Sequence, residues 1–216
     1  YAGLRPLVAN AAGSTTTKLS REHTVDRPVP GFISIAGGKY TTYRVMGKDV
    51  IDLAVNDLRR IVAESITEKL PAIGADGYFA LVQQSAQLAQ MSGLAQTTIT
   101  HLLDRYGSLV NEIFEIIDVD KKMAELLTPE LAYLKAEIIY AVTHEGAQSV
   151  DDILSRRTRI AFEASDGGEG VASTVATLIA PILGWDAAAK KASVSEFTSQ
   201  LKNERAALDK LLTRTR

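Results

Sequence analysis

The stretch Ser34-Ile35-Ala36-Gly37-Gly38-Lys39-Tyr40-Thr41-Thr42-Tyr43-Arg44 decides the fold of the first part of the chain. The β-branched and aromatic run at 32–35 predicts a buried strand. Its two adjacent glycines allow positive φ angles and the close approach of another backbone or a ligand. From Val45 onward the apolar residues recur at three and four positions, which is typical of a helix. The stretch therefore predicts a strand, a tight glycine turn and the start of a helix.

A junction of this kind directs backbone N–H groups and the positive end of a helix dipole at one point. We expect a hydroxyl of Thr41 or Thr42 to cap the helix by accepting from its first free N–H groups. Lys39 adds a full positive charge at the same place. The junction suits a phosphate or an electron-rich ring oxygen, although a glycine pair between a strand and a helix is commonly only a turn.

Five segments, in the same order along the chain, resemble the signatures of FAD-dependent glycerol-3-phosphate dehydrogenases. The segment 37–44 resembles their GGK-x-TTYR signature, and the resemblance extends over nearly the whole chain. The other four are G-L-R-P-L at 3–7, S-R-E-H at 20–23, E-I-I-Y-A-V at 137–142 and R-R-T-R at 156–159.

This resemblance implies a flavoprotein that oxidises the C2 hydroxyl of glycerol 3-phosphate to dihydroxyacetone phosphate. Hydride would pass to N5 of FAD and the electrons then to quinone. The implied location is cytoplasmic, with peripheral attachment to the surface of the cytoplasmic membrane. A related flavin-dependent glycerophosphate oxidase, with oxygen as acceptor, is one alternative. A helical interaction module without chemistry is another.

The resemblance also assigns residues to a site. In the resembled enzymes, the arginine that matches Arg5 lies beside the reacting carbon of the substrate and polarises the hydroxyl on that carbon. The resemblance makes Arg5 and Lys39 the catalytic candidates. From spacing alone, the favoured interpretation of Arg5, Arg21 and Lys39 is three ordinary surface cations. The candidates for substrate binding are Arg5, Arg21, Lys39 and Thr41, and those for cofactor binding are Gly37, Gly38, Lys39, Thr41 and Thr42.

The composition excludes several classes of function. Hydrophobic residues make up 46% of the 216 residues, enough for a sizeable core, and the net charge of −2 gives no case for nucleic acid. There is no cysteine, and the three histidines lie far apart, so we expect no metal site. No apolar run approaches the roughly 20 residues that span a bilayer.

The pattern predicts an α+β protein with two domains: residues 1–73, a β-rich remnant of an FAD and substrate domain, and residues 74–216, an all-helical, bundle-like cap. The breakers at 71–77 mark the boundary. No G-x-G-x-x-G fingerprint follows a predicted strand. We therefore expect the C-terminal portion of a longer enzyme, which alone neither holds FAD nor turns over. The helices are expected at 45–65, 78–91, 98–106, 109–117, 129–144, 149–164, 170–183 and 187–213.

The arginines of the second part have two interpretations. Arg156, Arg157 and Arg159 occupy one helical turn and cannot all share a face. Ion pairing with Glu137 and Glu145 on the preceding helix is the favoured interpretation, and an anion or lipid-headgroup site is the alternative. The same helices could supply a homodimer surface or a membrane-facing surface.

Overall fold

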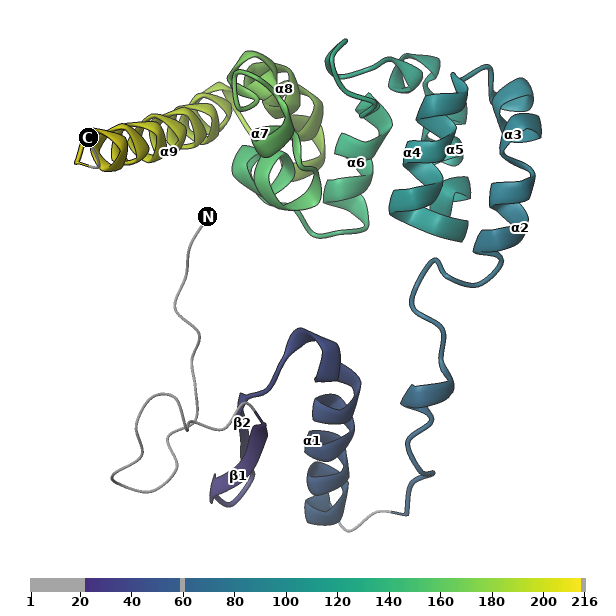
Figure 1. The fold of residues 1–216 in the computed structure, drawn as a ribbon, viewed down its shortest axis with the longest axis vertical. Coiled ribbons are helices and arrows are strands. Elements are labelled where there is room, and N and C mark those ends of the chain that lie inside the picture. Colours follow the sequence, from purple (N-terminus) through teal and green to yellow (C-terminus); the bar gives the residue numbers. More distant parts are fainter. Residues whose placement is uncertain (1–21, 59–60, 215–216) are drawn as a thin grey trace. The chain divides into compact units, whose positions relative to one another are not determined.

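The computed structural model describes residues 22–58 and 61–214. The chain divides into two compact units, Tyr1–Pro71 and Ala72–Arg216, and each is described by itself (Figure 1). This division falls two residues before the boundary expected from the sequence.

The first unit contains an antiparallel hairpin of β1 (His23–Val29) and β2 (Phe32–Gly37), followed by η2 (Tyr40–Thr42) and α1 (Tyr43–Leu58). A turn at Pro30 and Gly31 joins the strands, with φ of 79° at Gly31. The two prolines and the glycine at 28–31 favour a turn over 27–31, but residues 27–29 belong to β1, so the turn is confined to Pro30 and Gly31. An irregularity in register between Asp26 and Val29 accommodates Pro28, which lacks a backbone donor.

Helix α1 ends at Leu58, so the predicted helix over 45–65 is too long. The β-branched Ile61, Val62 and Ile66 favour extended backbone over helix. Each of these side chains is more than half exposed, which leaves no packing to override that preference. Beyond them lies the short η3 (Thr67–Lys69).

None of the residues described in the first unit is buried. Phe32 on β2 and Tyr43 and Val45 on α1 are each more than half exposed. The strand predicted at 32–35 is therefore present but not buried, because a two-stranded sheet with one helix cannot enclose a hydrophobic core.

The second unit is helical, as predicted, apart from a single isolated bridge between Leu126 and Leu134 among its described residues. Its elements are α2 (Tyr78–Gln83), α3 (Ser85–Ser92), α4 (Gln96–Tyr106), η4 (Gly107–Leu109), α5 (Val110–Val119), η5 (Lys121–Ala124), α6 (Lys135–Thr143), the π-helical η6 (Asp152–Arg157), α7 (Ile160–Glu163), η7 (Glu169–Val171), α8 (Ala172–Leu183) and α9 (Ala187–Arg214).

Helix α6 stands between two hydrophobic clusters of this unit (Figure 1). Its Ile138 and Val142 pack in the cluster formed with η6, α7, α8 and α9. Its Ala136 and Tyr140 pack in the cluster formed with α4 and α5. Because α6 contributes to both clusters, it is the central helix of the unit.

Three predicted helices of this unit are wrong in detail. The predicted helix over 78–91 is interrupted at Gln84, between α2 and α3. The predicted helix over 129–144 begins only at Lys135, because 125–134 forms a loop in which Leu127 N donates to the Tyr133 carbonyl at 2.8 Å. The predicted helix over 149–164 starts as expected, with Ser149 Oγ accepting from Asp152 N at 3.0 Å. It then breaks after η6, where the Thr158 hydroxyl donates to the Ile153 carbonyl at 2.7 Å.

The expected α+β class is thus confirmed, with a small hairpin unit and a larger helical unit. In the part of the chain that the structure describes, no helix combines the length and apolarity needed to cross a bilayer.

Candidate functional site

The junction after β2 has the predicted glycine turn. Gly37 and Gly38 both adopt left-handed backbone, with φ of 78° and 81°. This region is accessible to glycine at little cost and disfavoured for residues with a Cβ. The two glycines let β2 reverse into η2 within two residues.

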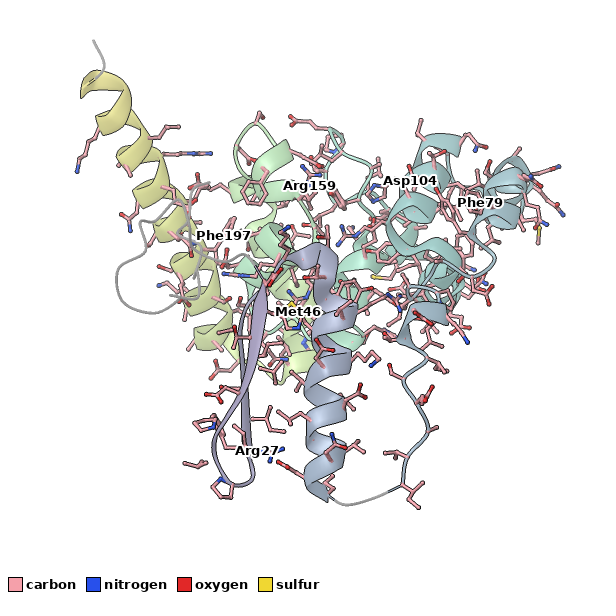
Figure 2. All side chains as sticks on the ribbon, turned by 60° about the horizontal axis from the view of Figure 1, so that its bottom comes forward. Arg27, Met46, Phe79, Asp104, Arg159 and Phe197 are labelled. Atoms are coloured by element: carbon pink, nitrogen blue, oxygen red, sulfur yellow. The ribbon has the colours of Figure 1, made fainter. Side chains whose placement is uncertain are left out.

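The inner side of the turn is closely packed. A Cβ placed on Gly38 would lie 2.5 Å from Met46 Sδ and 3.2 Å from His23 Cβ. Met46 belongs to α1, and its side chain lies on the side of the helix that faces the hairpin (Figure 2). Gly38 is therefore required both by its backbone conformation and by the space available.

Lys39 is held by its backbone and free at its side chain. Its N–H donates to Thr42 Oγ1 at 3.2 Å, and its carbonyl accepts from the Thr42 hydroxyl and the Thr42 N–H, both at 3.0 Å. The side chain is exposed, and it has no ion-pair partner within the described ranges. The main chain of Lys39 is fixed while its ammonium group remains available.

The predicted helix cap is corrected by these contacts. Lys39 occupies the N-cap position, and the hydroxyl of Thr42 binds back to Lys39 instead of to the following amides. Thr41 is exposed beside it. The turn thus presents Lys39, Thr41 and the 91% exposed Tyr40 to its surroundings. A cation beside the first amides of a helix suits an anionic or electron-rich group.

The structure brings together Gly37, Gly38, Lys39, Thr41 and Thr42 on one turn. Arg5 and Arg21 lie outside the described residues. The roles of all seven stay predictions. In the described ranges no group of three or more His, Asp or Glu side chains is placed to hold a metal ion.

A second pair of residues adjoins the turn. His23 Nε2 lies 2.7 Å from Asp49 Oδ2 and joins the start of β1 to α1. In the sequence, His23 stands out only as part of the S-R-E-H segment, and nothing distinguishes Asp49. A carboxylate within an amphipathic helix gives no sequence signal that its partner is a histidine 26 residues away.

A groove of about 990 Å³ in the first unit runs between α1 and the segment 62–68. Arg44, Asp52 and Glu64 are among its lining residues, and Arg44 donates to the Thr67 carbonyl. None of the predicted site residues lines this groove. The candidate site is therefore the exposed turn and not this groove.

The second unit contains a buried polar network centred on Glu137. This fully buried carboxylate accepts from His101 Nε2 at 2.9 Å, from the Tyr106 hydroxyl at 3.0 Å and from Leu134 N at 2.6 Å. Burial, with a contribution from Glu137, raises the pKa of Tyr106 well above its usual value. The phenol therefore remains a hydrogen-bond donor. The network joins α4 to α6.

The arginines of the R-R-T-R segment are paired locally, and Glu137 is not among their partners. Arg156 contacts Asp151 and Asp152, and Arg159 lies 3.4 Å from Glu163. Arg157 Nε donates to the Glu145 backbone carbonyl at 2.9 Å, so one of the three connects to the end of α6. The favoured interpretation, pairing with carboxylates of the preceding helix, is wrong because nearer acidic residues occupy two of these arginines.

Comparison with known proteins gives a consistent result. The family described as the C-terminal domain of alpha-glycerophosphate oxidase matches residues 65–190. "Glycerol-3-phosphate dehydrogenase 2" of Mycobacterium tuberculosis is 47% identical over 204 residues, which cover 94% of this chain and 35% of that protein. The "Glycerol-3-phosphate dehydrogenase" of Mycobacterium leprae is 45% identical over the same shares.

The mitochondrial "Glycerol-3-phosphate dehydrogenase" of Homo sapiens is 33% identical over 190 residues, covering 86% of this chain and 26% of that protein. This chain thus spans 35% of the length of its mycobacterial relatives. The similarity to glycerol-3-phosphate dehydrogenases that the five segments predict is confirmed.

Proposed function

Because the chain belongs to the family of the C-terminal domain of alpha-glycerophosphate oxidase, we propose that it forms part of an FAD-dependent oxidoreductase acting on glycerol 3-phosphate. One observation carries the proposal. The match to the mycobacterial dehydrogenase covers 94% of this chain. It therefore includes the glycine turn, which lies well inside both ends of the chain. The turn has left-handed glycines and an exposed Lys39 that has no ion-pair partner among the described residues, and both features suit the proposed chemistry.

The residues of the turn fit the edge of a flavin and a phosphorylated substrate. Gly37 has no side chain to obstruct the approach of a ring, and η2 begins shortly after it, at Tyr40. A helix start aimed at the N1/O2 edge would stabilise negative charge there. FAD, when bound, would accept the hydride from C2 of the substrate. Binding of the ADP portion is expected outside this chain, which has no G-x-G-x-x-G fingerprint after a strand.

The cations of the first unit would hold and activate the substrate. Oxidation removes a hydride from C2 and a proton from its hydroxyl, giving a ketone. Arg5 would polarise that hydroxyl, Arg21 would grip the phosphate in bidentate fashion, and Lys39 would bind it as a point charge. Each replaces part of the water shell of a dianion with a charge-assisted hydrogen bond.

The first unit is expected to be part of a larger FAD and substrate domain. Its described residues bury no side chain, and Phe32, Tyr43 and Val45 are more than half exposed. Such a surface is stable when another layer of protein covers it. The helical unit, residues 74–216 in the expected division, would then be a cap joined through the segment 71–77.

We further propose that the electrons pass to quinone at the cytoplasmic face of the membrane, to which the complete enzyme attaches peripherally. The relatives' names support a dehydrogenase. The name of the matching family supports the alternative, which is an oxidase with oxygen as its electron acceptor.

The test compares this chain with the complete protein. The complete protein should purify with the absorbance of oxidised flavin and bleach on addition of glycerol 3-phosphate. Turnover with a soluble quinone should exceed the formation of hydrogen peroxide from oxygen; the reverse ratio would establish the oxidase. The 216-residue chain alone should remain colourless and inactive. A complete protein without flavin would refute the proposal.

A further inference from the structure

His23 lies directly opposite the glycine turn. It is the first residue of β1 and pairs with Gly37, the last residue of β2. Its Cβ is 3.2 Å from the position that a Cβ on Gly38 would occupy, and its side chain is only 17% exposed. The side chain of His23 therefore packs against the backbone of the turn, and a displacement of this side chain would disturb the turn.

Asp49 reaches His23 from the helix that follows the turn. The 2.7 Å contact between Nε2 and Oδ2 is in the range of charge-assisted hydrogen bonds. It closes a loop of 26 residues that contains both strands, the turn and the first two turns of α1. The turn between Gly37 and Tyr40 thus lies inside a loop whose two ends are held together by this contact.

A second contact attaches the far end of α1 to the same strand. Arg27 lies near the tip of the hairpin (Figure 2). Its guanidinium group is 2.5 Å from the carboxylate of Asp57, in the last turn of the helix. Helix α1 is therefore fixed to β1 at two points. Loss of the His23–Asp49 contact would remove the polar attachment nearest the turn, where the packing of Met46 against Gly38 would remain, and leave the Arg27–Asp57 pair at the far end of the helix.

We propose that His23 and Asp49 are a positioning pair that sets the placement of the Gly37–Thr42 turn, and thereby of Lys39 and the first amides of the helix, against substrate and flavin. The inference rests on the proposed function for what the turn contacts. It does not depend on that function for the claim that the pair fixes the turn. Neither residue need touch substrate.

The first experiment tests the placement of the turn without using activity. Hydrogen exchange of a peptide covering residues 38–42 is measured in the complete protein for His23→Ala and Asp49→Asn. The control is Asp52→Asn, one turn further along the same helix, where the carboxylate pairs with exposed Lys48 at 2.6 Å. Exchange should accelerate about tenfold in the two test variants and stay within about twofold of wild type in the control.

The second experiment tests the effect on the reaction. His23→Ala and Asp49→Asn should lower kcat by about 10- to 100-fold and also raise KM for glycerol 3-phosphate, because a misplaced turn affects both alignment and phosphate binding. His23→Gln retains a donor near the position of Nε2 and should recover part of the loss. The double variant should be no worse than His23→Ala, because the contact is already lost when the histidine is removed.

The outcomes separate this inference from the proposed function. Exchange in the test variants that matches Asp52→Asn would overturn the positioning role. Accelerated exchange with unchanged kcat and KM would overturn its relevance to catalysis. A wild-type protein that does not oxidise glycerol 3-phosphate would refute the proposed function, while accelerated exchange would still establish that the pair fixes the turn.

Discussion

His101 on α4 and Glu137 on α6 are joined by a hydrogen bond of 2.9 Å between Nε2 and Oε1, inside the helical unit where Glu137 is fully buried. The same carboxylate accepts from Tyr106 and from the backbone of Leu134, the residue before α6. One side chain therefore caps the central helix and attaches it to its neighbour.

Glu137→Gln should destabilise the helical unit by about 1–3 kcal/mol, or about 3–10 °C in melting temperature. Glutamine has a single acceptor oxygen, so it cannot serve both the His101 and Tyr106 donors and the Leu134 amide. Thermal denaturation followed by far-UV circular dichroism measures the effect. Glu130→Gln, at an exposed position, is the matched control. Equal melting temperatures for the two variants would contradict this account.

Glu145, just beyond the same helix, should respond in the opposite direction. One of its carboxylate oxygens is buried without a hydrogen-bond partner in the described part of the chain. Burial raises the pKa of Glu145, although Arg105 and Arg157 act to lower it. A raised folded-state pKa means that the ionised form is less stable in the native state than in the unfolded one. This free-energy cost is absent below the pKa of the unfolded state, about 4.3, and is fully present above the pKa of the folded state.

Glu145→Gln should therefore stabilise the chain at pH 7, by at most about 1 kcal/mol, the order of one net hydrogen bond. The gain should shrink to nothing as the pH falls below about 4. Melting temperatures between pH 4 and 7 test the sign, with the exposed Glu115→Gln as control. Destabilisation at pH 7 would instead mean that the two arginines outweigh the burial of the carboxylate.

Two neighbouring arginines should differ in their effect on stability. Arg157→Ala removes the 2.9 Å hydrogen bond to the Glu145 carbonyl and should cost about 1–3 kcal/mol. Arg156 is 51% exposed and pairs within its own segment, so Arg156→Ala should cost less than about 1 kcal/mol. Neither change should alter turnover of the complete enzyme more than about twofold. A large loss of activity in Arg157→Ala with an unchanged melting temperature would favour an anion site at this segment.

At the glycine turn, the free-energy cost of a strained backbone can be measured separately from the cost of steric crowding. Gly38→Ala should destabilise the first unit of the complete protein by about 1 kcal/mol for its left-handed backbone and about 1–3 kcal/mol more for the clash with Met46. Gly31→Ala has the same backbone conformation, with no atom within 4 Å of the new Cβ, and should show only the first cost. Adding Met46→Ala to Gly38→Ala should recover most of the second. Equal denaturant midpoints for the two glycine variants would disprove the packing argument.

The sequence predicted most of the fold because its signals are local. The left-handed glycines at 37 and 38 and the strand before them follow from residue types within six positions. The loop at 125–134 was missed because Pro129 fits the first turn of a helix equally well, and only burial of Leu134 and Glu137 selects the later start at Lys135. The His23–Asp49 contact is likewise set by tertiary packing, and the sequence around either residue does not indicate it.

The last prediction concerns Lys39. Lys39→Ala in the complete enzyme should lower kcat/KM for glycerol 3-phosphate roughly 30- to 1000-fold, since removal of one charge-assisted contact to a phosphate or a developing oxyanion costs about 2–4 kcal/mol. Lys48→Ala removes an exposed lysine of the same unit that already pairs with Asp52, and should change kcat/KM less than about twofold. If Lys39 binds phosphate, its loss should appear mainly in KM, and oxidation of plain glycerol should be penalised less than that of glycerol 3-phosphate. If it acts at the reacting centre, the loss should appear in kcat for both substrates. Kinetics of Lys39→Ala indistinguishable from those of Lys48→Ala, with flavin bound and melting temperatures equal, would remove Lys39 from the site.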